Sequence, residues 1–519
     1  MRLALALGAL LIAGGAHALE LTAEEARGQR VYQEGAGASG EPILARVGRE
    51  GAEVPASAVP CAGCHGRDGK GRPEGGVEPL PVTWSYLAKP YGHEHAFGRR
   101  HPAFTEESLA RSIADGVDPA GNPLNVAMPR YAMAASDMAD LIAYIKRLEH
   151  DLDPGLGTDV LRIGTLLPTD GPLGDLGQAM RAVLEAYLAD VNASGGVHGR
   201  RVNLVVTPLP DVGTDRVEGV TRLMSEDVFA LLSPFTTGVE GEATRLADAS
   251  RMPVVGPFTL FPDSGAETGR FSFYVYPGLP GEARALVEYA ARHLGLKNPA
   301  VAVLHPEGEE YAPVVAAVTS QAARHGWERV QTVTFTPGAF NLGGRAAAQA
   351  EAGAEVVLLL GGREGVASFV EGLRATGARP YLLLPGSLAS EAVLGAADAL
   401  GDRVYLAFPS LPSDQGGPGL QAFRDLQARH ALPRRHLAAQ TSAYVAAEVL
   451  VEALKRSGRD VSRESLQQTL ERLVDFPTGL TRQVTYGPLR RVGLSGAHIV
   501  GLDPQARTFR PTGVWIDLD

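Results

Sequence analysis

The pentapeptide Cys61-Ala62-Gly63-Cys64-His65 holds the only two cysteines of the 519-residue sequence and decides the fold of its N-terminal part. Thiols at positions i and i+3 have the spacing that attaches a haem through thioether bonds, and the adjacent histidine then reaches the iron. A zinc site would need a second Cys/His pair, and a disulfide would not need the histidine. The motif therefore predicts one covalently attached haem c, provided that the chain reaches an oxidising compartment.

The N-terminus has the features of a secretory signal peptide, predicted over residues 1–18. Met1-Arg2 is positively charged, Leu3 to Ile12 is apolar but too short to span a bilayer, and Ala16-His17-Ala18 is a small-x-small cleavage site. No cysteine follows the cleavage site, so a lipid anchor is not expected, and no later segment approaches the ~20 apolar residues of a membrane helix. Haem attachment combined with export predicts a periplasmic protein, soluble after cleavage, that starts near Leu19.

Length and composition are those of an ordinary globular protein. At ~150 residues per domain, 519 residues correspond to about three packing units. The hydrophobic content is 45% and the charged content 21%. The net charge is -11 without a run of Lys or Arg, which argues against nucleic acid and anionic lipid as partners. Because haem takes both cysteines, the long C-terminal part must be stabilised by its hydrophobic core alone.

A haem bound through His65 needs a second axial ligand, and the methionines between the motif and residue 150 are the first candidates. Met138 falls in the first turns of a predicted helix and is assigned to the core. Met128 precedes Pro129, which keeps its segment extended, and an extended loop can lay a thioether across the porphyrin. We assign Met128 as the distal ligand, with Met133 in reserve. The alternative is bis-His ligation by residues that are otherwise interpreted as solvated loop histidines: His93, His95 and His101.

Two helices are expected to flank this region. Thr22 followed three residues later by Glu25 is a capping box that opens the first helix. Ser136 is expected to cap the last one. Gly28 lies inside the first helix at a cost of ~1 kcal/mol relative to Ala. This cost predicts a close crossing with the last helix, where Tyr144 would lie over the missing side chain.

These features together resemble class I cytochromes c over residues 19–150. The shared features are an N-terminal helix with a buried glycine, the Cys-x-x-Cys-His-Gly motif, the late Met128-Pro129-Arg130-Tyr131 and a closing amphipathic helix with an aromatic residue. The resemblance implies an all-α domain with His65 as the proximal ligand and Met128 as the distal ligand. It also implies single-electron transfer through an exposed haem edge.

Residues 151–160 are expected to link two different sequence patterns, because Asp151 to Asp159 is polar and rich in Gly and Pro. From Leu161 onward, short apolar runs alternate with longer helical periods in two successive blocks. The expected strands are Leu161–Leu167, Val202–Val206, Phe229–Leu232, Pro253–Val255, Val301–Leu304, Val330–Phe335, Val356–Leu360, Tyr381–Leu384 and Val404–Phe408. The expected helices of the first block are Gln178–Asn192, Asp215–Ser225 and Val239–Arg251. Such repetition predicts two lobes over residues 161–519, each built on a parallel sheet.

Ligands of open α/β sheets bind beyond the carboxyl ends of the strands, so two facing lobes form a cleft that a hinge can close. The sequence of this part contains several recognisable segments in order: Ile163 to Pro172 (IGTLLPTDGP), Asn192, Gly195 to Arg200 (GGVHGR), Gln440 to Leu454 and Val484 to Pro488. Their order resembles the type I periplasmic binding proteins, specifically the branched-chain amino-acid (Leu/Ile/Val) receptors. The resemblance implies a two-lobed α/β fold with a small molecule in the interlobe cleft.

The resemblance also implies where that molecule is held. The receptors grip the ligand carboxylate with backbone N–H groups and hydroxyls in the loop after the third strand, here Pro234 to Gly238. The loop after the next strand, Gly256 to Thr259, offers Phe258 and Thr259. The candidate ligand-binding residues are Thr236, Thr237, Phe258, Thr259, Tyr311, Arg363 and Ser387. Thr237 is equally interpreted as a helix N-cap. Arg363 can equally pair with Glu364 or be solvated.

One departure from the receptors bears on the ligand. Amino-acid receptors place a carboxylate beside the ligand ammonium, and the corresponding position here is Ser387. An ammonium group would therefore lack its usual counter-ion. The sequence predicts an acid, an alcohol-derived metabolite or an aromatic compound in preference to a zwitterionic amino acid.

The leading functional hypothesis is an electron-transfer protein whose haem domain is joined to a small-molecule-binding module. Such fusions resemble the accessory proteins of quinoprotein (pyrroloquinoline-quinone) alcohol dehydrogenase systems, and this association rests on resemblance alone. The chain shows no hydride-cofactor site and no nucleophile–base pair, so no enzyme is predicted. The alternatives are a receptor that captures a solute for an ABC-type importer, a solute sensor with a secondary haem domain, and a docking protein with a degenerate cleft.

Overall fold

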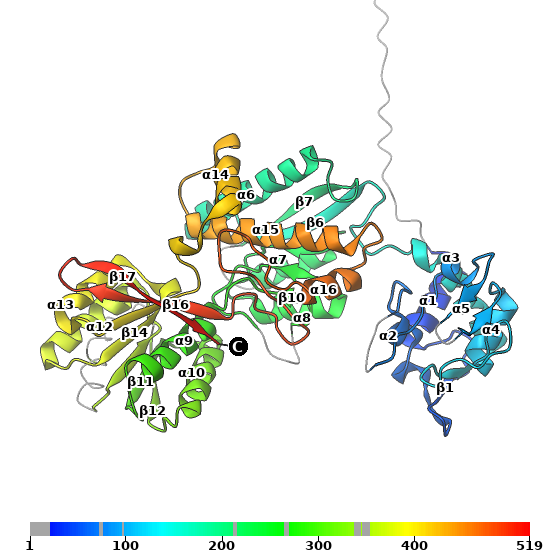
Figure 1. The fold of residues 1–519 in the computed structure, drawn as a ribbon, viewed down its shortest axis with the longest axis horizontal. Helices are drawn as coiled ribbons and strands as arrows, with labels where there is room; N and C mark the ends of the chain where they lie inside the picture. Colours follow the sequence, from blue (N-terminus) through cyan, green and yellow to red (C-terminus); the bar gives the residue numbers. More distant parts are fainter. Residues whose placement is uncertain are drawn as a thin grey trace, which may run out of the picture. The chain divides into compact units, whose positions relative to one another are not determined.

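The computed structural model describes residues 21–518 except 72–75, 96–97, 211–214, 264–268, 337–343 and 345–352. The signal peptide expected over residues 1–18 lies outside the described residues. The chain divides into two compact units, Met1–Gly157 and Thr158–Asp519, each with its own hydrophobic core (Figure 1). The proposed linker, residues 151–160, contains this division. In the described part of the chain, no helix is long and apolar enough to cross a membrane.

The first unit is built mainly from helices. They are α1 (Ala23–Glu34), α2 (Cys61–His65), α3 (Trp84–Leu87), α4 (Glu106–Asp115) and α5 (Ala135–Arg147). Short strands accompany them: β1 (Leu44–Val47), β2 (Ala52–Pro55), β3 (His93–Glu94), β4 (Arg100–His101) and β5 (Arg130–Ala132). The strands form two small sheets of order β2-β1-β5 and β3-β4. The helices follow the expected fold, and the short strands are additions that periodicity did not reveal, because they hold only two to four residues each.

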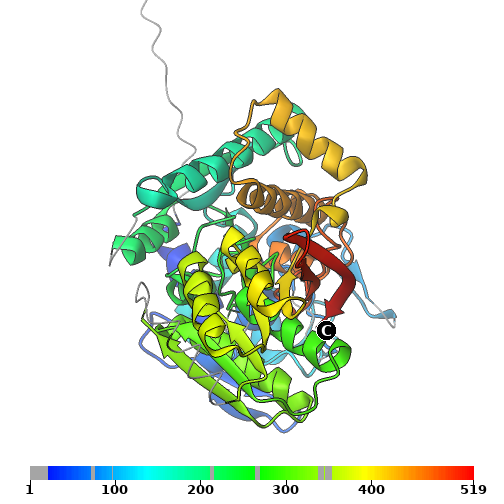
Figure 2. The same cartoon turned by 90° about the vertical axis from the view of Figure 1, so that its left-hand side faces the viewer.

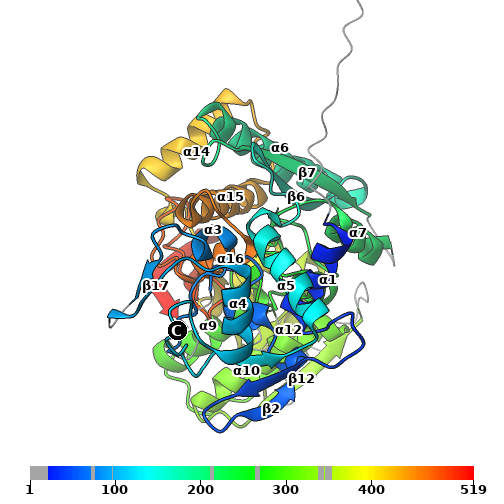
Figure 3. The same cartoon turned by 90° about the vertical axis from the view of Figure 1, so that its right-hand side faces the viewer.

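Helices α1 and α5 pack against each other (Figure 3), and Gly28 of α1 lies against the backbone of α5. The predicted capping box is present: the N–H of Glu25 donates to the Thr22 hydroxyl at 3.2 Å, and the N–H of Thr22 donates to the Glu25 carboxylate at 2.8 Å. A Cβ at Gly28 would lie 1.9 Å from the carbonyl oxygen of Asp140 and 2.8 Å from Cβ of Tyr144. The predicted close crossing is confirmed, and it requires glycine.

The start of α5 differs from expectation. The helix begins at Ala135 with Ala134 as its N-cap, so the prediction that Ser136 caps it is wrong. The carboxylate of Asp137 in the first turn instead accepts hydrogen bonds from the N–H of Ser39 at 3.1 Å and from its hydroxyl at 2.5 Å. A carboxylate near a helix N-terminus is favourable, and this contact also ties α5 to the segment that follows α1.

Lobe 1 of the second unit is a parallel five-stranded sheet of order β10-β9-β8-β6-β7. Its strands are β6 (Val160–Pro168), β7 (Arg201–Leu209), β8 (Ala230–Leu232), β9 (Val254–Val255) and β10 (Ser272–Phe273). The lobe also contains α6 (Gly174–Ala193), α7 (Asp215–Ser225), α8 (Glu240–Ser250), α14 (Gly417–Arg429), α15 (Leu437–Ser457) and α16 (Arg463–Glu471). The crossovers through α6 and α7 run in opposite directions along the sheet, so right-handed connection places these helices on opposite faces.

Lobe 2 contains a seven-stranded sheet of order β12-β11-β13-β14-β15-β16-β17, and Figure 2 turns this lobe toward the viewer. Its strands are β11 (Val301–Pro306), β12 (Val330–Phe335), β13 (Val356–Leu359), β14 (Tyr381–Pro385), β15 (Val404–Phe408), β16 (Gly496–Asp503) and β17 (Thr508–Asp517). Its helices include α9 (Gly278–His293), α10 (Ala312–Arg324), α12 (Arg363–Thr376) and α13 (Ala397–Leu400). One core cluster joins the sheet to α9 and α10, and another joins it to α12 and α13, so helices cover both faces.

The α/β alternation expected from residue 161 onward is confirmed, since each predicted strand and helix is present with small shifts at its ends. The expectation of a purely parallel sheet is wrong for lobe 2, because β16 and β17 pair as an antiparallel hairpin at its edge. The carboxylate of Asp503 accepts the N–H groups of Gln505 and Ala506, both at 2.9 Å, and so shapes the turn of this hairpin.

The chain passes between the two lobes through residues 274–277, 409–416 and 472–495. The first and the last of these segments are hydrogen-bonded to each other. The N–H of Tyr274 donates to the carbonyl of Arg491 at 2.8 Å, and the N–H of Leu494 donates to the carbonyl of Val275 at 3.0 Å. These three connections (residues 274–277, 409–416 and 472–495) lie outside the long helices and strands of the lobes. Backbone dihedral changes in such segments allow two lobes to rotate relative to each other.

Candidate functional site

The Cys-x-x-Cys-His motif folds into the short helix α2. Helical positions i and i+3 lie on one face, so Cys61 and Cys64 point in the same general direction. Both cysteines are free; Cys61 is half-buried and Cys64 is exposed. Burial raises the pKa of the Cys61 thiol to about 12, so this thiol is uncharged at neutral pH. The motif thus presents two free thiols on one helical face.

The side chain of His65 is held in one tautomer. Its Nδ1 lies 3.0 Å from the carbonyl oxygen of Leu80, so Nδ1 carries a proton and donates it. Burial lowers the pKa of His65, although the Leu80 carbonyl opposes the shift, and the neutral ring is favoured. The lone pair of Nε2 is therefore available for a metal ion.

Met128 lies in a turn directly before β5. The N–H of Met128 donates to the carbonyl of Asn125 at 3.1 Å, and the N–H of Ala127 donates to the Asn125 side chain at 2.9 Å. The Met128 carbonyl accepts from the guanidinium of Arg130. The segment is non-helical, as Pro129 predicts. These hydrogen bonds hold its backbone in place, and Met128 is half-buried.

The other two methionines pack differently. Met138 packs against the core of the first unit, as predicted. Met133 is also half-buried against that core. Packing there gives its thioether a structural role, which weakens the case for Met133 as a reserve ligand.

The expectation that three histidines of this unit are solvated loop residues is wrong. His101 is only 7% exposed, because the ring of Phe104 lies edge-on against it at a centroid distance of 5.0 Å. The rings of His93 and His95 lie 5.1 and 5.0 Å from that of His101. The two-stranded sheet β3-β4 brings these side chains together, a pairing that the sequence pattern did not reveal.

In the second unit, the loops that follow β8 and β9 meet at the carboxyl end of the lobe 1 sheet. The N–H of Thr236 donates to the carbonyl of Phe258 at 3.1 Å, and the N–H of Phe258 donates to the carbonyl of Pro234 at 2.8 Å. Thr236 is 4% exposed, and Thr237 is half-buried. The structure therefore brings the predicted lobe 1 residues together.

Glu240 lies beside these loops and organises their polar groups. Helix α8 begins at this residue behind Val239, so Thr237 is not the N-cap. The Glu240 carboxylate accepts the hydroxyl of Thr259 at 2.6 Å and the N–H of Gly238 at 2.8 Å. Burial raises the pKa of Glu240 although both donors oppose the shift. The Thr259 hydroxyl is thus committed to Glu240 as its donor.

Arg216 on α7 borders the same loop. Its Nε is buried and has no hydrogen-bond partner among the described residues. Its guanidinium carbon lies 5.8 Å from the ring centroid of Phe235, and a Cβ at Gly238 would lie 3.1 Å from its Nη1. A buried donor without a partner is costly, so this cation can stabilise a ligand anion.

In lobe 2, Tyr311 precedes α10 and is half-buried. Its ring meets that of Phe261 edge-on at 5.3 Å and stacks on His305 at 5.4 Å. Arg363 is exposed at the first position of α12. Tyr311 thus contacts an aromatic ring of lobe 1, whereas Arg363 faces solvent.

Ser387, at the carboxyl end of β14, is bonded to a buried acid. Its N–H donates to the carboxylate of Glu282 at 3.0 Å, and its hydroxyl donates to the same carboxylate. Glu282 lies on α9 with no exposed surface, and burial raises its pKa to about 7 despite these donors. The Ser387 hydroxyl is therefore committed to this buried carboxylate as a donor.

A cleft of about 1320 Å³ lies between the two lobes of the second unit. Its volume exceeds the ~300–1000 Å³ of a typical small-molecule pocket, so a small ligand would be enclosed only after the lobes close. Of the predicted ligand residues, Thr237 lines it. Its walls carry charges of both signs, from Glu240, Glu242, Asp263, Arg284, Glu309, Glu310, Arg324, Arg490 and Arg491.

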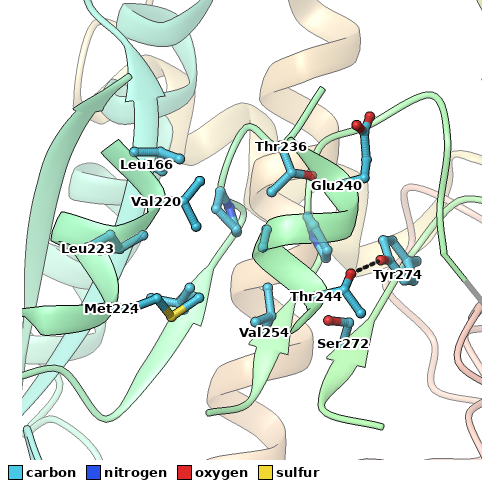
Figure 4. A pocket seen from close by; sticks show the side chains of 14 residues that line it. Leu166, Val220, Leu223, Met224, Thr236, Glu240, Thr244, Val254, Ser272 and Tyr274 are labelled. Carbon is cyan, nitrogen blue, oxygen red and sulfur yellow. Dashed lines mark hydrogen bonds between the residues drawn. The ribbon is translucent and has the colours of Figure 1, made fainter. Parts of the chain in front are cut away.

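A much smaller cavity of about 10 Å³ lies inside lobe 1 (Figure 4). Apolar side chains from α7 and the sheet form most of its wall, and the hydroxyls of Thr244 and Tyr274 lie 3.4 Å apart at one side. The volume is close to the minimum for one water molecule, so this cavity is a packing gap and not a ligand site. Thr236 lines this gap rather than the cleft.

Comparison with protein families agrees with this division. Residues 160–493 match the family model described as periplasmic binding protein. The chain belongs to the periplasmic binding protein family. Residues 49–149 match the cytochrome c model, so a cytochrome c domain precedes the binding-protein domain.

Relatives and solved structures resemble the binding-protein domain. The Leu/Ile/Val-binding protein homolog 7 of Brucella abortus is 24% identical over 338 residues, which cover 62% of this chain and 83% of the relative. A branched-chain amino-acid ABC transporter protein of Thermus thermophilus, solved with bound valine, is 20% identical with a TM-score of 0.54, over 70% of this chain and 97% of that one. A fatty acid ABC transporter substrate-binding protein of Thermomonospora curvata is 18% identical with a TM-score of 0.54, over 71% and 93%. At these identities the structures establish the fold.

A cytochrome c domain carries covalently attached haem c, and the residues of the first unit fit this group. Two free thiols lie on one face of α2, and the adjacent His65 keeps its Nε2 lone pair available. Apolar side chains are exposed next to both proposed ligands: Leu80, whose carbonyl holds His65, and Val126, two residues before Met128. An apolar porphyrin face would cover such side chains.

Sequence reasoning missed Arg216, Glu240 and Glu282. A signal for Glu282 existed, because it falls in line with Leu279 and Leu286 on the apolar stripe of α9, where a charged residue is unexpected. Arg216 and Glu240 gave no such signal. Their roles depend on loops that approach them only after folding.

Proposed function

We propose that this protein is a periplasmic electron-transfer protein in which a c-type haem domain is joined to a small-molecule-binding domain. The observation that carries the proposal is the hydrogen bond from His65 Nδ1 to the Leu80 carbonyl, because it frees Nε2 beside two free thiols. Bound haem supplies one-electron exchange at its iron. The relatives of the larger domain are binding proteins, which supports a non-enzymatic role.

The proposed ligand set uses four residues of this chain. Cys61 and Cys64 would form the thioether bonds, His65 would supply Nε2, and Met128 would supply its sulfur. With both His65 and Met128 bound, the iron would have no open position for a substrate, which fits electron transfer better than catalysis at the metal. The pinned turn that holds Met128 supports this assignment, since a fixed backbone lowers the entropy lost on ligation.

For the binding domain we propose a ligand that carries a carboxylate. The unpaired Nε of Arg216, beside the loop after β8, offers a donor to an anion. One structural neighbour is named as a fatty-acid receptor and another holds valine, and a carboxylate is the group common to both ligands. Ser387 is committed to Glu282, so this position gives a ligand ammonium no counter-ion, and a small organic acid is the preferred class.

Calorimetric titration tests this assignment. A panel of short organic acids, their primary alcohols, and branched-chain amino acids would be titrated into the full-length protein. We expect binding by an acid and not by its alcohol, and a loss of at least about tenfold in affinity for Arg216→Met. Arg222→Met, which removes an exposed guanidinium from the same helix, is the matched control. If Arg216→Met bound the acid as tightly as Arg222→Met does, Arg216 would not contribute to the ligand site.

As the redox partner we propose a periplasmic dehydrogenase of the quinoprotein alcohol dehydrogenase class. The test mixes the oxidised protein with such an enzyme and its alcohol, and follows the haem absorbance. Reduction that requires both enzyme and alcohol is the expected result. An oxidised haem that responds to dithionite but not to enzyme plus alcohol would reject this partner.

A second candidate function is a receptor for an ABC-type importer, and the Leu/Ile/Val-binding relatives favour it. The haem potential measured with and without ligand separates the two candidates, because thermodynamic coupling acts in both directions. An electron-transfer protein regulated by its ligand shows a shifted potential. An importer receptor shows ligand binding with an unchanged potential, and solute uptake in cells then depends on the binding domain alone.

A further inference from the structure

The β3-β4 hairpin of the first unit gathers three imidazoles on one face. His93 of β3 pairs with His101 of β4 in the antiparallel register. His95 directly follows β3, two residues beyond His93. Ring centroids lie 5.7 Å apart for His93 and His95, 5.1 Å for His93 and His101, and 5.0 Å for His95 and His101.

Two of these rings direct the same atom at each other. Nε2 of His95 and Nε2 of His101 are hydrogen-bonded to each other at 2.9 Å. Nδ1 of His101 lies 2.8 Å from the carbonyl oxygen of Pro102 and must donate to it, so in the neutral ring His101 Nε2 holds a lone pair. His95 Nε2 therefore carries the proton of this hydrogen bond and donates it to His101 Nε2. Two nitrogens bound at right angles to one ion with bonds of ~2.05 Å also lie ~2.9 Å apart, so the same separation suits two adjacent metal ligands.

The surroundings hold these rings in place. The ring of Tyr86 lies 4.4 Å from that of His93, and His93 Nε2 donates a hydrogen bond to the backbone carbonyl of Tyr86 at 2.8 Å. Next to the cluster, the buried carboxylate of Asp118 is paired with Arg99 at 3.1 Å.

We propose that this hairpin binds a divalent transition-metal ion through Nε2 of His95 and Nε2 of His101, separately from the haem. Binding moves the His95 proton from Nε2 to Nδ1, so no proton need be released. Among the described residues, no three His, Cys, Asp or Glu side chains are grouped to hold a metal ion, so solvent or an exogenous ligand completes the coordination. A right angle between two imidazoles suits the tetragonal geometry of Cu²⁺, which also binds such ligands more tightly than Zn²⁺ does.

The test titrates Cu²⁺ and Zn²⁺ into the full-length ferric protein, prepared without a histidine tag. Calorimetry gives the stoichiometry, and electron paramagnetic resonance of the bound Cu²⁺ counts its nitrogen ligands. We expect one Cu²⁺ per chain with two imidazole nitrogens, and weaker binding of Zn²⁺. His95→Gln and His101→Ala should each lower Cu²⁺ affinity by at least about tenfold.

The control is His150→Ala, which removes an imidazole that is largely exposed in the same unit. It should leave Cu²⁺ binding unchanged. His95 is less buried than His101, so His95→Gln tests the site even if His101→Ala does not fold. Cu²⁺ affinity equal in wild type and His95→Gln would overturn the proposal. A changed ferric haem spectrum in His95→Gln would also overturn it, since these histidines would then belong to the haem centre.

Discussion

At the residue scale, Met128 and Met133 are the two candidates for the second haem ligand. Met128 lies in a turn whose backbone is pinned by Asn125 and Arg130, whereas Met133 packs against the core. We expect Met128→Ala to open the sixth position of the haem, so that added imidazole shifts its absorption spectrum. Covalent attachment through the cysteines should persist, because the thioether bonds do not involve this residue.

Met133→Ala is the matched variant for this prediction. We expect its haem spectrum to be unchanged with or without imidazole, and the first unit to lose ~1–3 kcal/mol of stability through the cavity created in its packing. Chemical unfolding followed by haem absorbance measures this loss. If Met133→Ala were the variant that opened the haem to imidazole, the two assignments would have to be exchanged.

Glu448 on α15 links stability to pH. One of its carboxylate oxygens is buried without a partner among the described residues, and burial raises its pKa to about 8, with Tyr444 opposing the shift. An unfolded glutamate titrates near ~4.3. Between these two pH values the folded state binds one more proton than the unfolded state, so stability from this group is present at low pH and is lost as pH rises to about 8.

Glu448→Gln should therefore weaken the pH dependence of the free energy of unfolding of the second unit. At pH near 8 we expect the variant to exceed wild type by ~1–3 kcal/mol in free energy of unfolding, because the amide need not ionise. Glu452→Gln, on the same helix but paired with Arg456, is the control and should retain the wild-type dependence. Denaturant unfolding at pH 5 and pH 8 gives both values. A variant no more stable than wild type at pH 8 would contradict the argument.

At the scale of elements, the crossing of α1 and α5 depends on Gly28. We expect Gly28→Ala to destabilise the first unit by ~2–4 kcal/mol, because the new Cβ would lie 1.9 Å from a backbone oxygen that cannot move without shifting α5. Gly241→Ala, in helix α8, is the matched change, since nothing lies within 4 Å of the added carbon there. It should be neutral or stabilising by up to ~1 kcal/mol. Thermal unfolding of the two units separates the outcomes, and an equally mild effect at Gly28 would mean that the helices can move apart.

The elements of the fold differed in how well the local sequence predicted them. Long strands and helices followed their periodicity, and the capping box at Thr22 placed the start of α1 correctly. The hairpin β16-β17 and the short pairs β3-β4 and β1-β2 did not, because their pairing depends on partners and turns outside any one periodic window. Ser136 failed as a cap because α5 already begins at Ala135, and Asp137 in its first turn is hydrogen-bonded to Ser39.

At the scale of the whole molecule, two units with separate cores should unfold separately. We expect calorimetry to give two transitions, and the haem absorbance to follow only one of them. A ligand of the binding domain should raise the temperature of the other transition by mass action and leave the temperature of the haem transition unchanged. A single transition reported alike by haem absorbance and by far-ultraviolet circular dichroism would show that the units stabilise each other.

What the sequence determined by itself was local. The spacing of Cys61, Cys64 and His65 predicted the haem, and Gly28 predicted a helix crossing. The alternation of strands and helices from Leu161 predicted a two-lobed α/β domain. Each of these rests on residues within one turn, one helix or one strand, where backbone geometry alone relates spacing to direction. Family comparison then agreed with both domains.

Tertiary structure alone decided which polar groups meet. The carbonyl of Leu80 selects the tautomer of His65, Ser387 donates to Glu282, Arg216 reaches the loop after β8, and the hairpin joins His95 to His101. These partners come from loops and strands whose approach is set by packing and burial, and no periodic pattern records such contacts. Hydrogen bonds and charges at the functional site therefore became assignable only once the chain was folded.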